Sequence, residues 1–385
     1  MNSSIYWIWL TEALGYCCPR VYTLSQQISP EELYQADWDT LMMQGILTPK
    51  ENKKLSNTPL DHAVRIWERA QRRGVTILTP QDPQYPQQLL EIYSVPGVLY
   101  VLGDPKLLSR QPAMAMVGTR NMTPYGRRVA QEFSGALAQA GFTIVSGLAL
   151  GVDTVCHTQA LKVGGKTVAV LGCGINRDYP PSNRLLKELI VQYGAVVSEF
   201  PPDAPPLAGH FPLRNRIISG LAQGVLVVEA GVKSGSLITA GHGLTQGKDI
   251  FAVPGSIFEP TSQGTLKLIR QGATPVTSVQ EILQEYEGRF VLEPLPREAS
   301  SNTVGESEES PQTKPARRIQ PPEYLTEEQR EVFRVLEREP KHMDQIIVET
   351  GLGVGQVMAA LTELETYCLA KSHANRHFSL GTGKE

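Results

Sequence analysis

Short apolar runs and amphipathic stretches alternate through the middle of the chain. An apolar run at 113–117 ends at Gly118-Thr119-Arg120, and a β-branched run at 142–145 ends at Ser146-Gly147. Between them, the stretch from Val129 to Ala140 repeats apolar residues at the spacing of one helix face. Strand, glycine turn, helix and strand in this order are typical of a βαβ unit, whose two strands run parallel.

The same alternation continues toward the C-terminus. Further apolar runs end in small or polar residues at Gly172-Cys173-Gly174, Ser198-Glu199, Glu229-Ala230 and Pro254-Gly255. The stretches between the runs have helical spacing, at 152–163, 183–192, 212–222 and 237–246. β-Branched strands separated by helices are typical of a parallel sheet covered on both faces. The sequence therefore predicts a doubly wound α/β domain, in which ligands bind beyond the carboxyl ends of the strands.

The first part of the chain, residues 1–70, is predicted to be helical. Ser29-Pro30-Glu31-Glu32 and Thr48-Pro49-Lys50-Glu51 each place proline and glutamate after a capping hydroxyl, which marks a helix start. All four tryptophans lie in this region, and we interpret them as core residues of a small helical domain rather than base-stacking side chains. Short strands at 75–78 and 98–102 are then expected to lead into the large domain.

The C-terminal part changes character twice. Apolar residues first give way to Pro, Ser and Glu, which is typical of a flexible linker. A pattern of three short helices and a hairpin follows, with Thr326 capping the first helix, and this favours a winged helix-turn-helix. The third helix carries Glu363 and Glu365 but no Lys or Arg, so phosphates would repel it, and we expect a protein-contact or regulatory domain. The four predicted parts (helical domain, α/β domain, linker and winged helix) are 1–70, 71–292, 293–322 and 323–385.

Composition and charge limit the possible classes of protein. The 385 residues carry a net charge of only −3, so no overall excess of positive charge points to nucleic acid. The charge is uneven, however: 15 Lys and Arg against 12 Asp and Glu give +3 for 112–290, whereas 7 against 11 give −4 for 323–385. The five cysteines show no CxxC spacing and no apolar run is long enough to span a bilayer. We expect a cytoplasmic protein with free thiols and no membrane partner.

Signatures of cofactor sites and of common catalytic sites fail at specific positions. Gly172-Cys173-Gly174 is followed by Arg177 where a dinucleotide fingerprint needs its third glycine, and the one P-loop-like segment precedes a strand. There is no GxSxG elbow, and the histidines lack metal-ligand spacing. Ser146, Asp153 and His157 lie close in sequence, but we interpret the first two as turn residues and His157 as a packed side chain. We expect no cofactor, no metal ion and no enzyme.

Groups that bind phosphate recur at the ends of the predicted strands. These groups are glycine N–H groups, hydroxyls and cations, and they converge on one edge of the sheet. The candidate residues are Gly118, Thr119, Arg120, Ser146, Gly147, Gly172, Gly174, Asn183, Arg184, Arg214, Asn215, Arg216, Lys233, Ser234, Gly235 and Ser236. So many such loops on one edge predict a groove that follows successive phosphates of a polynucleotide, rather than a site for one nucleotide.

Two glutamates at strand ends leave an alternative open. Glu199 and Glu229 are possible partners for Arg214 and Arg216, because a polar cleft that holds two carboxylates needs cations to balance them. At least one of the two arginines is then structural. The same glutamates are possible catalytic acids, which is the enzyme interpretation, although no nucleophile accompanies them.

Several segments resemble one known family. VGTRNMTPYG, IVSGLALGVDTVCH, FPLRNRIISGL and VVEAGVKSGSLITAGHGLTQGKDIFAVPGS are similar, in unbroken order across 82–276, to the DNA-processing protein A (DprA/Smf) family. The resemblance implies an extended Rossmann-like domain that binds single-stranded DNA without a cofactor. It also implies a homodimer that protects incoming strands in natural transformation and helps to load RecA recombinase in homologous recombination.

The resemblance extends to particular residues. Gly118-Thr119-Arg120 matches the family's phosphate-binding turn, with threonine in place of serine, and Arg184, Arg214-Asn215-Arg216 and Ser234-Gly235-Ser236 match other cleft positions. The N-terminal helices and the winged helix fit a three-part layout in which the first domain is SAM-like or helix-hairpin-helix-like. The segment at 14–18 departs from a helix-hairpin-helix turn because it lacks the glycine pattern.

Two other functions remain as alternatives. One is a Rossmann-like hydrolase of nucleoside monophosphates, in which a PGGxGT loop is expected where this chain has EAGVKSGSLITA. The other is a transcriptional regulator whose winged helix binds duplex DNA, which the acidic third helix disfavours.

Overall fold

The computed structural model describes residues 2–293, 325–337, 341–366, 369–373 and 377–380. The chain divides into two compact units, Met1–Ser300 and Ser301–Glu385. Almost all of the predicted linker, 293–322, lies outside the described residues.

The larger unit is built on one nine-stranded sheet. Its strands are β1 (Thr76–Leu78), β2 (Leu99–Gly103), β3 (Ala113–Val117), β4 (Thr143–Ser146), β5 (Lys166–Leu171), β6 (Ala195–Ser198), β7 (Gly224–Val227), β8 (Asp249–Ala252) and β9 (Thr274–Pro275). Their order across the sheet is β1-β2-β6-β5-β4-β3-β7-β8-β9. All neighbouring pairs are parallel except β1–β2 and β2–β6. The predicted doubly wound, mostly parallel fold is therefore confirmed, and the winding direction reverses between β3 and β7.

Helices cover both faces of this sheet. They are α7 (Pro124–Gln139), α8 (Val152–Lys162), α9 (Arg184–Tyr193), α10 (His210–Gly220), α11 (Ser236–Thr245), α12 (Gln263–Arg270) and α13 (Val279–Tyr286), with short 3-10 turns η1 (Gln87–Leu89), η2 (Pro105–Leu108) and η3 (Pro181–Asn183). Alternate residues of a strand point to opposite faces. In β3, Met114 and Met116 therefore pack with α7 and α8, whereas Ala115 and Val117 share a core with α10 and α11.

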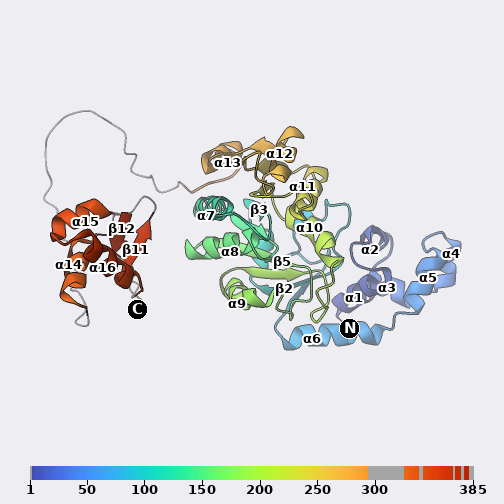
Figure 1. The fold of residues 1–385 in the computed structure, drawn as a ribbon. Helices are drawn as coiled ribbons and strands as arrows, with labels where there is room; N and C mark the ends of the chain where they lie inside the picture. Colours follow the sequence, from blue (N-terminus) through green and yellow to red (C-terminus); the bar gives the residue numbers. More distant parts are fainter. Residues whose placement is uncertain (1, 294–324, 338–340, 367–368, 374–376, 381–385) are drawn as a thin grey trace. The chain divides into compact units, whose positions relative to one another are not determined.

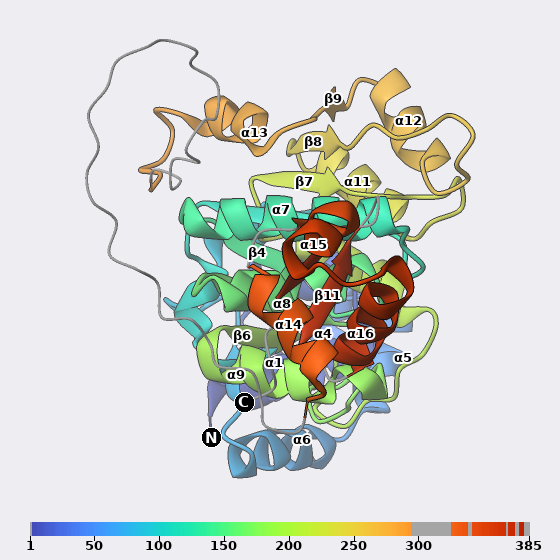
Figure 2. The same ribbon diagram turned by 60° about the vertical axis from the view of Figure 1, so that its left-hand side comes forward.

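The N-terminal helices belong to the same compact unit. They are α1 (Ser3–Leu14), α2 (Pro19–Ser25), α3 (Pro30–Gln35), α4 (Trp38–Met43), α5 (Pro49–Ser56) and α6 (Leu60–Arg72). Ser29 and Thr48 form the capping boxes that the sequence predicts at the starts of α3 and α5. Trp7 and Trp9 are buried in a core that continues to Tyr100 on β2. These helices lie at the β1–β2 end of the sheet, and α11 to α13 lie at the β8–β9 end (Figures 1 and 2).

The smaller unit has the predicted winged-helix fold. It consists of α14 (Glu327–Val335), β10 (Lys341–His342), α15 (Met343–Thr350), α16 (Val354–Thr366), β11 (Ala370–His373) and β12 (His377–Leu380), with sheet order β10-β12-β11. Thr326 caps α14 as predicted, and Gly351, at φ +69°, separates α15 from α16. Among the described residues no single helix is long and apolar enough to cross a bilayer; only α15 and α16 together, bent by 110°, reach the required length and composition.

Candidate nucleic-acid interface

A cleft of about 430 Å³ lies at the point where the winding direction reverses, between the carboxyl ends of β3 and β7. Crossover connections leave the sheet in opposite directions here, which is why doubly wound sheets bind ligands at this point. The cleft is lined by Val117, Gly118, Thr119, Arg120, Ala149, Asp153, Arg214, Asn215, Ile218, Gly231, Lys233, Ser234, Gly235, Ser236 and Thr239. Nine of the sixteen residues predicted from sequence are in this lining: Gly118, Thr119, Arg120, Arg214, Asn215, Lys233, Ser234, Gly235 and Ser236.

The first wall of the cleft is the turn after β3. Gly118 is required there, because a Cβ at this position would lie 2.5 Å from Cγ2 of Val152. The Thr119 N–H donates to the backbone oxygen of Glu229 at 2.8 Å, which ties the turn to the end of β7. Arg120 is exposed, and its guanidinium lies over the ring of Phe211, 5.9 Å from the centroid. The turn is thus fixed while its cation faces solvent.

Glu229 is the residue that fixes this turn to the start of α7. One carboxylate oxygen accepts from the Thr123 N–H at 2.9 Å and the other from the Thr123 hydroxyl at 2.6 Å. The carboxylate is buried against Gly126, where any Cβ would overlap it. Because both carboxylate oxygens accept from the N-cap residue of α7 and the side chain is buried, Glu229 holds the cleft in shape rather than presenting a free acid to it.

The second wall is the loop from β7 into α11. Lys233 is exposed, and the hydroxyls of Ser234 and Ser236 lie 2.8 Å apart at the helix start. The Asn215 side-chain amide donates to the backbone oxygen of Gly235 at 3.3 Å. The N–H groups of Ser236 and Leu237 bond to Ser234, and that of Ile238 bonds to Gly235. The positive end of the helix dipole at the start of α11 still lies in this wall, and it favours an anion.

The floor of the cleft contains a buried cation and a buried carboxylate. Arg214 donates from Nη1 to the backbone oxygens of Gly147, at 2.8 Å, and of Val170. Oδ2 of Asp153 accepts from the N–H groups of Gly147 and Ala149. Burial lowers the pKa of Arg214 to about 10 and raises the pKa of Asp153, since both charged forms lose hydration. Nε of Arg214 has no hydrogen-bond partner among the described residues.

Arg216 does not reach the cleft, although it is only two residues beyond Arg214. Its guanidinium forms a bidentate ion pair with Glu199, at 2.9 and 2.7 Å, and the two side chains are 4% and 2% exposed. Nε donates to the backbone oxygen of Ser94, and the Cys17 N–H donates to Glu199. The pair therefore joins α10, the end of β6 and the loop between α1 and α2. Of the roles left open for Glu199, the structure favours that of a structural partner.

Three other predicted residues are used within the fold. The Ser146 hydroxyl donates to the backbone oxygen of Met116 at 2.6 Å, so it links β4 to β3. The buried Asn183 amide donates to the backbone oxygen of Leu148 and to the Thr154 hydroxyl. Gly147 packs against the Arg214 guanidinium, where any Cβ would overlap it.

The remaining predicted residues lie around the loops after β5. Gly172 packs on the Phe211 ring, and Gly174 packs on the backbone of Pro201, so neither position has room for a Cβ. Arg184, at the start of α9, is exposed and pairs with Asp178 and Glu188.

Phe211 is one of the site residues that sequence analysis missed. With Tyr179 it lines a small pocket that shares Arg120 and Arg214 with the cleft, and the two rings lie 5.3 Å apart. An aromatic residue at the start of α10, three residues before Arg214, was the available signal. Thr239 was also missed, although it lies one turn after Ser236 on the same face of α11.

The apparent triad of Ser146, Asp153 and His157 has no catalytic geometry. Nδ1 of His157 bonds to the Thr167 hydroxyl at 2.6 Å, and Ser146 bonds to backbone. Within the described part of the chain, no three His, Cys, Asp or Glu side chains gather to hold a metal ion.

Comparison with known proteins gives consistent matches. Residues 76–287 match the family model described as DNA recombination-mediator protein A, and residues 314–374 match that of the DprA winged helix domain. Protein Smf of Synechocystis is 40% identical over 311 residues, covering 77% of this chain and 78% of the relative. The structure of DNA processing protein A from Streptococcus pneumoniae is similar with a TM-score of 0.65 at 35% identity, over 74% of this chain and 98% of that one. The structure of DNA processing protein A from Helicobacter pylori is similar with a TM-score of 0.51 at 31% identity, over 56% of this chain and 97% of that one.

Proposed function

Because the chain belongs to the DNA recombination-mediator protein A family, we propose that its switch-point cleft binds the sugar–phosphate backbone of single-stranded DNA. The Helicobacter pylori relative binds single-stranded DNA, which supports the same ligand class here. The proposed role is binding without chemistry on the strand.

One observation carries this proposal: Arg120 and Lys233 are exposed on the two walls of the same cleft, and neither has an ion-pair partner among the described residues. Arg184, an exposed arginine that the sequence also predicts for the site, instead pairs with Asp178 and Glu188. Two cations without an ion-pair partner in the lining of one cleft, together with the hydroxyls of Thr119 and Ser234 in the same lining, favour a ligand that brings more than one negative charge. Successive phosphates of a nucleic acid strand meet this requirement.

A recombination mediator has to keep a strand available for pairing. A cleft that holds phosphates leaves the Watson–Crick edges of the bases free, which is the state in which RecA must receive the strand. We propose that the protein protects incoming single strands in natural transformation and transfers them to RecA in this state.

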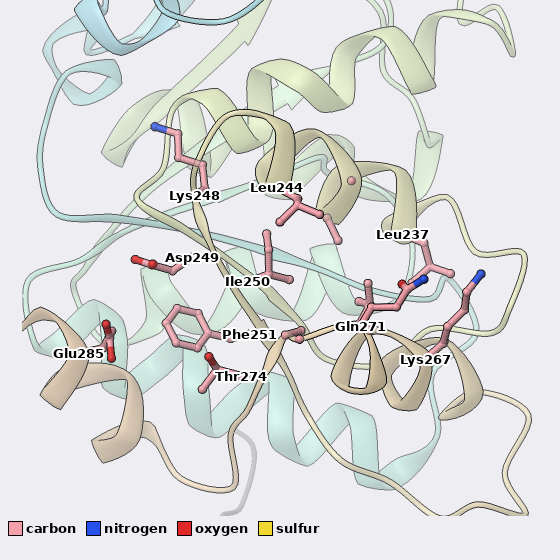
Figure 3. Close-up of a pocket in the computed structure, with 16 residues that line it drawn as sticks. Leu237, Leu244, Lys248, Asp249, Ile250, Phe251, Lys267, Gln271, Thr274 and Glu285 are labelled. Carbon is pink, nitrogen blue, oxygen red and sulfur yellow. The ribbon is translucent and has the colours of Figure 1, made fainter.

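We propose further that the protein acts as a homodimer through the end of the sheet where β9 is the edge strand. A hollow of about 470 Å³ lies there between α11, β8, α12 and β9 (Figure 3). Leu244 lines it and is 70% exposed, and Lys267 and Glu285 also line it, so one patch offers apolar surface and both signs of charge. A self-complementary patch of this kind suits a two-fold interface. Leu244→Asp should yield monomers in sedimentation velocity, whereas Leu185→Asp, at an equally exposed leucine on α9, should not.

The hydrolase alternative has little support in the site. Glu229 is occupied by Thr123 and Glu199 by Arg216, so neither carboxylate is free to act as a general acid or base. The duplex-binding alternative meets the difficulty that α16 carries no Lys or Arg and exposes Val354 and Met358.

The decisive experiment is fluorescence anisotropy of the purified protein with labelled single-stranded and duplex DNA of equal length across a salt series. We expect preference for the single strand. Arg120→Ala and Lys233→Ala should each weaken binding, and each should make the slope of log K against log[salt] shallower by about 0.7, the value for one phosphate contact on a single strand.

Arg289→Ala is the matched control, because Arg289 is an exposed arginine paired with Asp249 at the opposite edge of the sheet. Unchanged affinity and slope for both cleft variants would remove the cleft from DNA binding. A preference for duplex would favour the winged-helix regulator. Absence of DNA binding together with turnover of nucleoside monophosphates would favour the hydrolase.

A further inference from the structure

The loop that follows β8 presents large apolar side chains to solvent. Ile257 is 70% exposed and Phe258 is 85% exposed. Phe258 is among the most exposed large apolar side chains of the described residues, and a ring left in water forgoes the burial that normally stabilises an aromatic side chain.

This loop packs beside the second wall of the phosphate cleft: a Cβ at Gly231, which lines the cleft, would lie 3.5 Å from the Pro260 backbone oxygen. Its Thr261 backbone oxygen accepts from the Ala230 N–H at 2.8 Å, and the Ala230 oxygen accepts from the Gly264 N–H at 2.7 Å. Both bonds hold the loop against the β7–α11 segment that carries Lys233. On the other side, the Tyr125 hydroxyl donates to the backbone oxygen of Pro254 at 2.9 Å, which ties the loop to the first turn of α7. The loop is thus bonded to the segment that forms the second wall and to α7, the helix that follows the first wall.

The backbone that carries Phe258 is held in place although its ring is free. The Phe258 N–H donates to the Ser256 hydroxyl at 3.3 Å, and the Glu259 N–H donates to the Ser256 backbone oxygen at 3.1 Å. Gly255 packs so closely on the Ser262 hydroxyl that a Cβ would lie 2.2 Å from it. A ring presented on a fixed turn loses little conformational freedom when a ligand stacks on it.

We propose that Phe258, together with the adjacent Ile257, forms a stacking platform for a nucleobase next to the phosphates held in the cleft. The proposal rests on the proposed function and extends it beyond the cleft to a specific base-binding surface. Every base has a π-face, so the platform accepts any sequence. In a duplex those faces are already stacked, so it accepts only a single strand.

The local charge supports a base rather than a phosphate as the occupant. Glu259, directly beside Phe258, is exposed and would repel the strand's backbone. The platform therefore complements the cationic cleft: Arg120 and Lys233 hold phosphates, and Phe258 holds the face of a flanking base while its pairing edge remains free.

The test compares three substitutions of Phe258 in the full-length chain, by anisotropy with a labelled deoxythymidine oligonucleotide. Phe258→Ala should weaken binding about tenfold, within the range of one stacked base. Phe258→Tyr should retain near-normal affinity, and Phe258→Leu, which keeps apolar volume without a π-face, should behave like the alanine variant. The salt slope should not change in any of them, because no phosphate contact is lost.

An abasic scan of the oligonucleotide then identifies the partner base. At one position, removal of the base should weaken wild-type binding but leave Phe258→Ala binding unchanged, since the two losses remove the same contact. Purely additive losses at every position would overturn the proposal. Wild-type affinity of Phe258→Ala, or wild-type affinity of Phe258→Leu, would also overturn the proposal.

Two measurements distinguish a failure of the stacking platform from a failure of the proposed function and from a role of Phe258 in oligomerisation. If Arg120→Ala also has no effect, the proposed function fails; if Arg120→Ala weakens binding and Phe258→Ala does not, only the platform fails. Sedimentation velocity of Phe258→Ala should match wild type, and a change in oligomeric state would assign the ring to a contact between copies of the chain and overturn the platform.

Discussion

The buried ion pair between Arg216 and Glu199 gives the sharpest test of how the arginines of α10 divide their roles. Arg216→Met keeps the length of the side chain but leaves Glu199 buried with only the Cys17 N–H as a described donor. It also leaves the backbone oxygens of Ser94 and Leu213 without this donor. Removing one partner of a buried pair typically costs about 3–5 kcal/mol, because the other charge stays desolvated.

That cost is large relative to a domain stability of about 5–15 kcal/mol. With an m-value of about 3 kcal/mol/M, it corresponds to a fall of about 1–1.7 M in the urea midpoint. The double variant Glu199→Leu with Arg216→Met removes both charges and should be more stable than Arg216→Met alone, with a coupling well above the 0.5 kcal/mol expected for independent sites.

Urea unfolding should be followed by two probes. Tryptophan fluorescence reports the N-terminal helices, since all four tryptophans are in that region, and far-UV circular dichroism reports the whole chain. We expect both midpoints to fall together, because the pair links the α1–α2 loop to the sheet. A loss below about 1 kcal/mol would refute the reasoning, since it would mean that the pair is hydrated in solution. In its folded state, the Arg216→Met variant should keep the wild-type slope of log K against log[salt] for single-stranded DNA. A shallower slope would mean that Arg216 contacts the strand.

Three further outcomes are expected. Burial, with a smaller contribution from Arg214, lowers the pKa of His157 to about 3, against about 6.5 in the unfolded chain. The unfolded chain therefore binds a proton that the folded chain does not. The contribution of His157 to the free energy of unfolding is complete above pH 6.5 and falls by about 1.4 kcal/mol per pH unit below it. Urea titrations at pH 6.5 and 5.0 should therefore differ by about 2 kcal/mol from this group, and His157→Gln should remove that part; an unchanged difference would mean that other groups cause it. Gly151 has φ +82°, and a Cβ there would lie 2.3 Å from the Thr119 backbone oxygen. Gly151→Ala should therefore destabilise the fold by at least about 1–3 kcal/mol and weaken DNA binding, because it displaces the turn after β3. Wild-type affinity of this variant in anisotropy would contradict this. Deleting 323–385 should leave most single-strand affinity intact, and a large loss would show that the winged helix binds the strand.

Local chemistry made much of the fold readable from the sequence. Ser29, Thr48 and Thr326 each begin a helix in the structure, because a hydroxyl that accepts from the third N–H beyond it stabilises a helix start in any context. The buried parallel strands were evident as continuous apolar runs, with ends displaced by at most about one residue. The turn after β3 was also evident, since glycine, hydroxyl and cation directly follow a buried strand. By contrast, nothing in the sequence pattern gave the antiparallel pairing of β2 or the short edge strand β9.

The roles of individual charged residues were decided by the tertiary structure alone. Arg214 and Arg216 are the same residue type in one motif, but positions two apart on a helix point about 200° apart around its axis. One guanidinium therefore lies under the cleft, and the other points to Glu199. Sequence determined that this helix carries cations to the carboxyl edge of the sheet. Which cation meets a buried carboxylate, and which is left for a ligand, depends on strand order and packing, because those bring distant residues within hydrogen-bonding distance.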